Sequence, residues 1–125
     1  MAVTHPTAAR NAIADTVVDR IDAGAGAGTL EFQTAGSVEV ATLTFSDPAF
    51  GAAAAGVAAA SAISSDTSAT GGTITKAVIK DSTGTEVFTC SVTATGGGGD
   101  IELSSVVVSA GQTVSVSSLT YTAPA

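Results

Sequence analysis

Residues 38–63 read VEVATLTFSDPAFGAAAAGVAAASAI, and this stretch decides how the rest of the chain is interpreted. Apolar residues alternate with polar ones at its start, but the alternation shifts by one residue before Leu43. A shift of one residue turns the buried face over, and a β-bulge at Ala41 or Thr42 would accommodate it. Pro48 then favours a turn, because proline lacks an N–H and restricts the residue before it. The first part of the stretch therefore predicts a bulged strand followed by a turn.

The alanine-rich second part of the stretch supports two interpretations. Alanine is the best helix former, so residues 52–62 could form a helix on propensity alone. Gly51, Gly56, the lack of charge over residues 49–65 and the strand signals nearby argue against a helix. We therefore predict a strand over Val57–Ile63. Its small side chains would allow another layer or another subunit to approach closely.

One amphipathic helix is predicted near the N-terminus, over residues 7–23. Apolar residues recur there every four positions from Ala9, with Thr7 as the expected N-cap and Gly24 as the end. The alternating Ala-Gly segment 23–28 then leads into the first strand. Its G-x-G motif does not predict a phosphate-binding loop, since such a loop follows a strand and precedes a helix, and here the order is reversed. A flexible connection is the expected role.

From residue 29 onward the sequence has the pattern of β-structure. Short apolar runs separated by turns rich in Gly, Ser and Asp predict about eight strands between residues 29 and 122. One pair is a hairpin around the turn Asp81–Gly84. The expected fold is mainly β: an antiparallel jelly-roll-type β-sandwich of about eight strands preceded by one N-terminal α-helix, with an immunoglobulin-like sandwich as the alternative. Residues 1–6 are expected to form an arm and residues 7–125 a single domain.

The composition indicates a thin core and an acidic surface. The chain has 125 residues, of which 25 are alanine, and its net charge is −7. Because small side chains bury little apolar area, we expect its stability to depend on association with its own copies or a scaffold. The negative charge disfavours nucleic acid and membranes as partners. The N-terminus lacks the pattern of a signal peptide, and the single cysteine suits synthesis in a reducing cytoplasm.

Few residues suggest catalysis or metal binding. His5 is the sole histidine and lies in the arm, where nothing constrains its position. Cys90 alternates with apolar residues and is expected to be a small buried hydrophobic residue, with only Lys76 and Lys80 as basic neighbours that could activate it. We predict no enzymatic activity, no cofactor and no metal, and we interpret the acidic helix face as solvated rather than as a Ca²⁺ site. The carboxylates considered are Asp15, Asp19, Asp22, Asp66 and Asp100.

Three segments resemble a family of small proteins from tailed bacteriophages and prophages, the head decoration or cement proteins. These segments are NAIADTVVDRIDAGAGAGTLEF at residues 11–32, ATLTFSDPAFGAAAAGVAAASAISSDTSA at residues 41–69, and VVVSAGQTVSVSSLTYTAPA at residues 106–125. The resemblance covers nearly the whole chain and implies a jelly-roll fold. It also implies a structural virion protein, made in the host cytoplasm and bound to the outer surface of the capsid.

The partners implied by this resemblance are the major capsid protein and further copies of the chain, as a dimer or trimer. The copies would clamp neighbouring capsid subunits together. Flexible termini can become ordered on a partner, and the alanine-rich strand has small exposed side chains. The expected interface residues are Ala2, Val3, Thr4, His5, Pro6, Val57 and Ala59.

Other functions fit the same composition. The chain could be a structural or carbohydrate-binding β-sandwich module of a phage tail or fibre, although one Tyr and no Trp leave few aromatic side chains to stack on sugars. It could also be a ring-forming tail tube or completion protein. An enzyme on a jelly-roll scaffold is the third alternative, for which the sequence offers no catalytic constellation.

Overall fold

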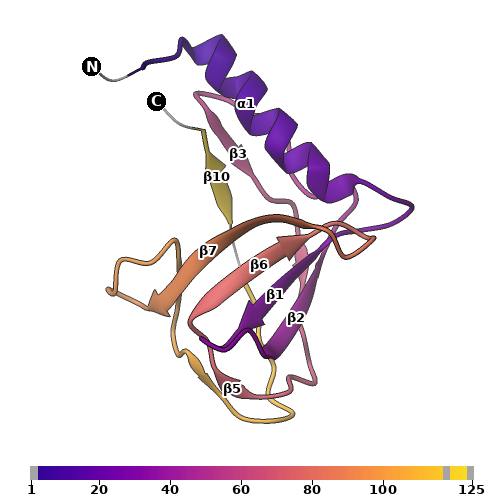
Figure 1. Cartoon of the computed structure of the whole chain (residues 1–125), viewed down its shortest axis with the longest axis vertical. Coiled ribbons are helices and arrows are strands. Elements are labelled where there is room, and N and C mark those ends of the chain that lie inside the picture. Colours follow the sequence, from indigo (N-terminus) through magenta and orange to yellow (C-terminus); the bar gives the residue numbers. More distant parts are fainter. Residues whose placement is uncertain (1–2, 117–118, 124–125) are drawn as a thin grey trace.

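The computed structural model describes residues 3–116 and 119–123. The chain is mainly β with one helix at its N-terminal end, as predicted (Figure 1). Helix α1 spans Thr7–Asp19 and continues as a single 3-10 turn, η1, over Arg20–Asp22. The strands are β1 (Thr29–Gln33), β2 (Glu39–Phe45), β3 (Val57–Ala59), β4 (Ile63–Ser64), β5 (Gly72–Thr73), β6 (Lys76–Lys80), β7 (Glu86–Ala94), β8 (Ile101–Leu103), β9 (Val107–Val108) and β10 (Thr120–Thr122).

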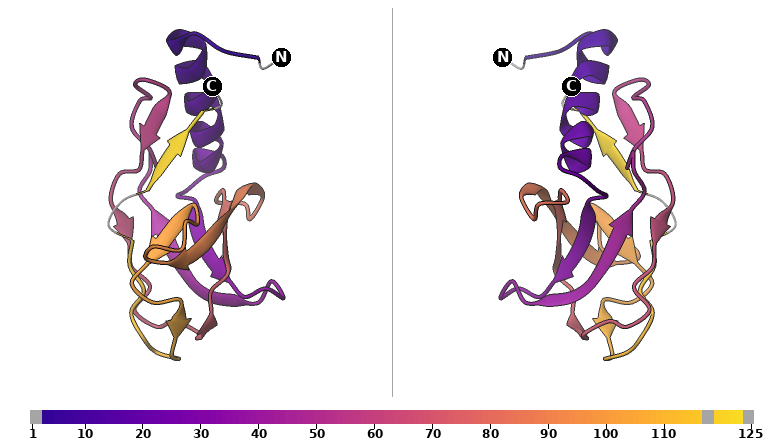
Figure 2. Two further views of the ribbon diagram at one scale, coloured as in Figure 1. Left: turned by 90° about the vertical axis from the view of Figure 1, so that its left-hand side faces the viewer. Right: turned by 90° about the vertical axis from the view of Figure 1, so that its right-hand side faces the viewer.

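The strands form one large curled sheet and two small ones. The large sheet has six strands in the order β4-β2-β1-β6-β7-β8, and the pairs β10-β3 and β5-β9 form the small sheets. The predicted hairpin is present as the antiparallel pair β6-β7. Figure 2 shows the molecule from two further sides, with α1 at one end and the curled sheet below it. The arrangement is sandwich-like, and helix α1 packs on the small sheet β10-β3 at one end of the molecule.

The prediction of about eight antiparallel strands is wrong in two respects. The described part of the chain has ten strands in three sheets, and β8 runs parallel to β7. The connection between β7 and β8 consists largely of glycine and folds back on itself. Both carboxylate oxygens of Glu102 accept backbone N–H groups there, from Gly96 at 3.2 Å and from Gly98 at 3.1 Å. These bonds hold the compact loop from which the chain re-enters beside β7 in the same direction.

The predicted bulge in β2 is present one residue earlier than expected. Val40 is the extra residue in the pairing between β1 and β2, whereas Ala41 or Thr42 was the predicted position. Val40 and Ala41 are both fully buried although they are adjacent in sequence. The carbonyl of Val40 accepts the N–H groups of Thr70 and Gly71, so the bulge also anchors the loop before β5.

The alanine-rich run forms a β-hairpin, not a helix. Ala54 and Val57 exchange backbone hydrogen bonds of 2.9 Å around a two-residue turn. Both residues of this turn have positive φ, which matches the turn type preferred by tight hairpins. The predicted strand Val57–Ile63 is present as β3 and β4, with a break between them. The chain changes partner at this break, from β10 to β2.

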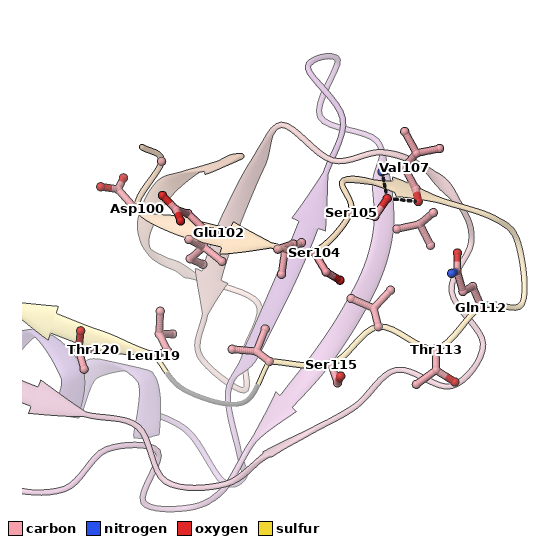
Figure 3. Close-up of a pocket in the computed structure, with 16 residues that line it drawn as sticks. Asp100, Glu102, Ser104, Ser105, Val107, Gln112, Thr113, Ser115, Leu119 and Thr120 are labelled. Carbon is pink, nitrogen blue, oxygen red and sulfur yellow. Dashed lines mark hydrogen bonds between the residues drawn. The ribbon is translucent and has the colours of Figure 1, made fainter. Parts of the chain in front are cut away.

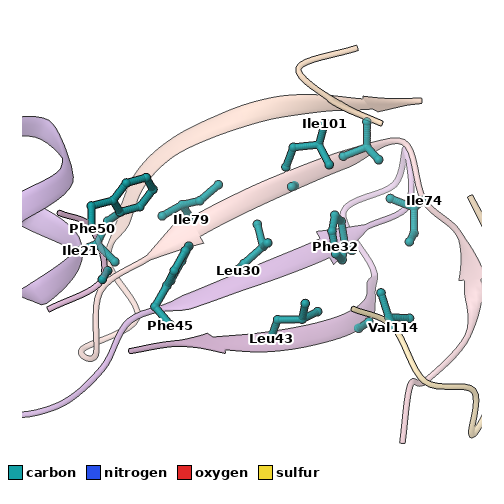
Figure 4. Close-up of a cluster of buried hydrophobic side chains, with 14 of the residues drawn as sticks. Ile21, Leu30, Phe32, Leu43, Phe45, Phe50, Ile74, Ile79, Ile101 and Val114 are labelled. Carbon is teal, nitrogen blue, oxygen red and sulfur yellow. The ribbon is translucent and has the colours of Figure 1, made fainter. Parts of the chain in front are cut away.

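The core lies on the inner face of the large sheet, where Ile21, Phe50 and Val114 from other segments join the buried side chains of the strands (Figure 4). Phe45 and Phe50 pack with ring centroids 5.8 Å apart, close to Ile21 at the end of the helical segment. The helix begins differently from the prediction: Pro6, not Thr7, is the N-cap, and its carbonyl accepts the N–H of Arg10. The largest fully buried side chains are Phe32, Ile21, Leu30, Leu43, Ile74, Ile79, Val18 and Val40.

Candidate functional site

The predicted interface residues of the arm lie on the surface. Val3 is 77% exposed, Thr4 and Pro6 are exposed, and His5 is half-buried. The arm leaves the start of α1 and extends sideways from the rest of the molecule (Figure 2). Ala2, the first residue of the predicted interface, lies outside the described residues. The arm is thus placed where another chain can reach it.

The other two predicted interface residues lie on β3, beside the helix. Ala59 is exposed and Val57 is half-buried, whereas Ala58 between them is completely buried. Helix α1 packs on β3, and the backbone N–H of Gly56 donates to Asn11 Oδ1 at 2.7 Å. The arm and β3 therefore lie at the same end of the molecule (Figure 1). We call the residues Val3, Thr4, His5, Pro6, Val57 and Ala59 the helix-end surface.

The acidic helix face is not a solvated face, and the prediction is wrong for two of its three aspartates. Asp15 Oδ1 accepts the N–H of Ala53 at 2.8 Å, and Asp22 Oδ1 accepts the N–H of Ala49 at 2.8 Å. Both carboxylates are half-buried, and only Asp19 is exposed. Together with Asn11, these side chains bond one edge of the alanine-rich hairpin to the helix. The acidic row therefore has a structural role.

The remaining candidate carboxylates are also bonded to backbone. Asp66 accepts the N–H of Thr42 at 2.9 Å and that of Ser68 at 2.8 Å. Asp100 accepts the N–H of Ser91 at 3.0 Å. Within residues 3–116 and 119–123, no three His, Cys, Asp or Glu side chains gather closely enough to hold a metal ion. These carboxylates position loops.

Cys90 lies half-buried on the inner face of β7 and has no lysine beside it. It pairs with Ala77 on β6, so Lys76 and Lys80 extend from the opposite face of that strand. Lys80 Nζ lies 3.2 Å from Glu31 Oε1, and Lys76 Nζ donates to Ser37. Burial raises the pKa of the Cys90 thiol to about 11, and the negative charge of Asp100 acts in the same direction. The environment disfavours the thiolate that a nucleophile needs.

The structure also contains a groove that the sequence did not indicate (Figure 3). One wall is formed by residues 99–105 with β9, and the other by residues 112–116 with Leu119 and Thr120. Its volume is about 650 Å³. We call this groove the C-terminal seam. The two walls come from chain segments that only the tertiary structure brings together.

The seam continues toward the inner face of β7. A second hollow of about 440 Å³ shares Asp100, Ile101, Leu119 and Thr120 with the first and extends to Phe88, Cys90 and Tyr121. The rings of Phe88 and Tyr121 pack with centroids 5.5 Å apart. Several apolar side chains along the seam are half-buried rather than buried, namely Phe88, Cys90, Leu103, Val116, Leu119 and Tyr121.

The fold and the two surfaces define a small β-rich, sandwich-like protein with an extended arm and an open seam. Comparison with models of protein families, with curated proteins and with solved structures yields no match. Among the described residues, no helix has the length and apolar character that crossing a membrane requires.

Proposed function

We propose that this chain is a structural virion protein that decorates the outer surface of a tailed-phage head and stabilises contacts between major capsid subunits. The observation that carries the proposal is the helix-end surface. It joins an extended, exposed arm to a strand of small side chains at one end of the molecule. Such a surface suits close contact with another protein.

The distribution of charge supports this location. The exposed charged side chains are mostly acidic: Asp19, Asp47, Glu86, Asp100 and Glu102, against Arg20. An acidic exterior is compatible with the outside of a head, whereas packaged DNA lies inside and repels it. Synthesis in the host cytoplasm and a place on the capsid surface are part of the proposal.

The open packing of the chain supports a protein that is stabilised by its neighbours. It exposes 6375 Å², against about 5,900 Å² for a typical folded monomer of its mass. Several of its half-buried apolar side chains lie along the seam and the hollow beside it, where another chain could cover them. Association as a dimer or trimer, and the jelly-roll strand order implied by the resemblance, belong to the same proposal.

The alternative is a structural or carbohydrate-binding module of a phage tail or fibre. The seam offers hydroxyl and carboxylate groups from Ser104, Thr113 and Glu102, which can hydrogen-bond to sugars. It has no aromatic residue among the described residues that line its larger hollow, although stacking on aromatic rings commonly strengthens such sites. Strong hits on a glycan array would favour this alternative.

The proposal is tested by adding the purified protein to expanded heads built from the major capsid protein of the phage or prophage that encodes it. We expect binding in a fixed ratio to capsid subunits and a higher temperature of head disruption. Absence of saturable binding would contradict a decoration role.

A matched pair of variants tests the helix-end surface. Ala59→Glu places a charge on exposed β3, and Ala35→Glu places the same charge on the exposed loop between β1 and β2. We expect Ala59→Glu to weaken head binding at least tenfold, which corresponds to about 1.4 kcal/mol, and Ala35→Glu to bind normally. Equal effects of the two substitutions would place the contact elsewhere.

A further inference from the structure

The C-terminal seam has the form of a splayed hairpin. The chain runs outward along β8 and β9, turns at residues 109–112, and returns along residues 112–116. The two sides bond to other partners: Val107 pairs with Thr73 in β5, and Val114 pairs with Asp66. In the part of the chain that the structure describes, no backbone hydrogen bond joins β8 to the returning segment. The seam therefore lies between two extended segments that do not pair with each other.

One wall of the seam is an open sheet edge. Within residues 3–116 and 119–123, strand β8 is the last strand of the six-stranded sheet and pairs only with β7. An unpaired strand edge offers backbone N–H and C=O groups to an incoming extended chain. Leu103, Val116 and Leu119 add apolar side chains that are only partly covered. The occupant that these features suit is a short extended segment with at least one apolar side chain.

The arm of this protein is such a segment. Pro6 has extended backbone angles, φ −67° and ψ 161°, and Val3 is 77% exposed. No backbone hydrogen bond joins Val3 or Thr4 to another described residue. Four extended residues span about 13 Å, and the three residues of β8 span about 10 Å, so the lengths match.

Charge and direction favour the arm of a second copy. Asp100 and Glu102 lie at one end of the seam (Figure 3), and the arm carries no carboxylate that they would repel. In the views of Figure 2 the arm extends away from its own body, so it is placed to meet a neighbouring molecule.

We propose that residues 3–6 of one copy bind in the C-terminal seam of another, as an added strand beside β8 that places Val3 against the apolar wall. This inference deepens the proposed function, because it assigns the contact between copies on which that function depends. The exposed face of β3 then remains for the capsid shell. If each copy donates its arm to the next, the chain closes into a dimer or a small ring.

Cysteine crosslinking in the full chain tests this contact directly, with Cys90 replaced by serine and a partner cysteine placed at Ser104, which follows β8 and lines the seam. In Val3→Cys/Ser104→Cys/Cys90→Ser, catalysed oxidation is expected to join the arm of one copy to residue 104 of another and to yield covalent dimers or closed oligomers. Val38→Cys is the matched control, since Val38 is also exposed, at 61%, but lies in the loop between β1 and β2. Omitting Ser104→Cys should abolish the specific product.

A second measurement does not depend on crosslinking. At a total protein concentration about ten times the dissociation constant, about a quarter of the seams stay free, so we expect alkylation of Ser104→Cys in the Cys90→Ser chain to be about fourfold slower than in the same chain with Val3→Asp. A Val3→Cys yield no higher than that of Val38→Cys, a crosslink only within one chain, or equal alkylation rates would overturn the inference.

Head binding distinguishes this inference from the proposed function. Arm-dependent oligomers that do not bind heads would preserve the inference and contradict the decoration role. Saturable head binding with equal alkylation of Ser104→Cys in the presence and absence of Val3→Asp would support the decoration role and contradict the inference. Crosslinking of Val3→Cys to a capsid subunit instead of to Ser104→Cys would assign the arm to the shell and also overturn the inference.

Discussion

At the scale of single residues, Gly56 is the point where the helix, the alanine-rich hairpin and the C-terminal strand meet. Its N–H donates to Asn11, and its carbonyl accepts the N–H of Ala123 at 2.8 Å. Its φ is +78°, and a Cβ atom there would lie 2.7 Å from Cζ of Arg10. A side chain at Gly56 therefore meets two penalties, one from the backbone and one from the guanidinium.

Substituting Gly56 by alanine separates these penalties when it is compared with Gly84→Ala. Gly84 has a similar φ of +86° but nothing within 4 Å of a Cβ atom. We expect Gly84→Ala to lower the free energy of unfolding by about 1–2 kcal/mol. Gly56→Ala should cost about 1 kcal/mol more, because Arg10 must move away from the carbonyl of Ala123. Urea unfolding measures the free energy of unfolding of both variants. Equal decreases would show that the Arg10 side chain can move aside without loss of stability.

Cys90 gives a second prediction at this scale, in the dependence of stability on pH. Its thiol pKa is raised from the ordinary value of 9.0 to about 11, mainly by burial. The stabilising contribution of the neutral thiol is fully present below pH 9 and decreases as the pH rises toward 11, because the unfolded chain ionises first. We expect the native chain to lose stability relative to Cys90→Ala over this range. If urea unfolding gives the same dependence of the free energy of unfolding on pH for the native chain and for Cys90→Ala, the raised pKa of Cys90 is refuted.

At the scale of elements, helix α1 is bonded to the alanine-rich hairpin through side chains rather than by apolar packing alone. Asp15→Ala removes the acceptor for the N–H of Ala53. Since a hydrogen bond to a charged group contributes about 1.5–3 kcal/mol, we expect Asp15→Ala to lower the free energy of unfolding by about that amount. Thermal or urea denaturation measures the change.

Two further variants control this prediction. Asp15→Asn retains the Oδ1 acceptor and should lose less stability than Asp15→Ala. Asp19 is exposed on the same helix, so Asp19→Ala should change stability by less than about 0.5 kcal/mol. If Asp15→Ala and Asp19→Ala behave alike, the bond to Ala53 contributes nothing measurable.

At the scale of the whole molecule, stability is expected to depend on protein concentration. An open seam and an alanine-rich core leave the single chain short of buried apolar area. If two copies cover each other's seams and unfold to separate monomers, the apparent free energy of unfolding increases by about 1.4 kcal/mol for each tenfold rise in protein concentration. This corresponds to roughly 5 °C in Tm. Calorimetry over a hundredfold range measures it, and a constant Tm with a monomer in sedimentation would contradict self-association.

Local patterns in the sequence determined the single helix, the β-rich remainder, the bulge in β2 and the β6-β7 hairpin. Periodicity and turn residues act between near neighbours, so these features can be predicted without the fold.

Only the tertiary structure decided which distant groups meet. Asp15 bonds a backbone group 38 residues away, and no local pattern distinguishes it from the exposed Asp19. Likewise, no local pattern indicates that Val107 pairs with Thr73 and Val114 with Asp66, which leaves the two walls of the seam unpaired with each other. Strand periodicity specifies which face of a strand is buried, whereas the choice of its partner depends on long-range contacts throughout the chain.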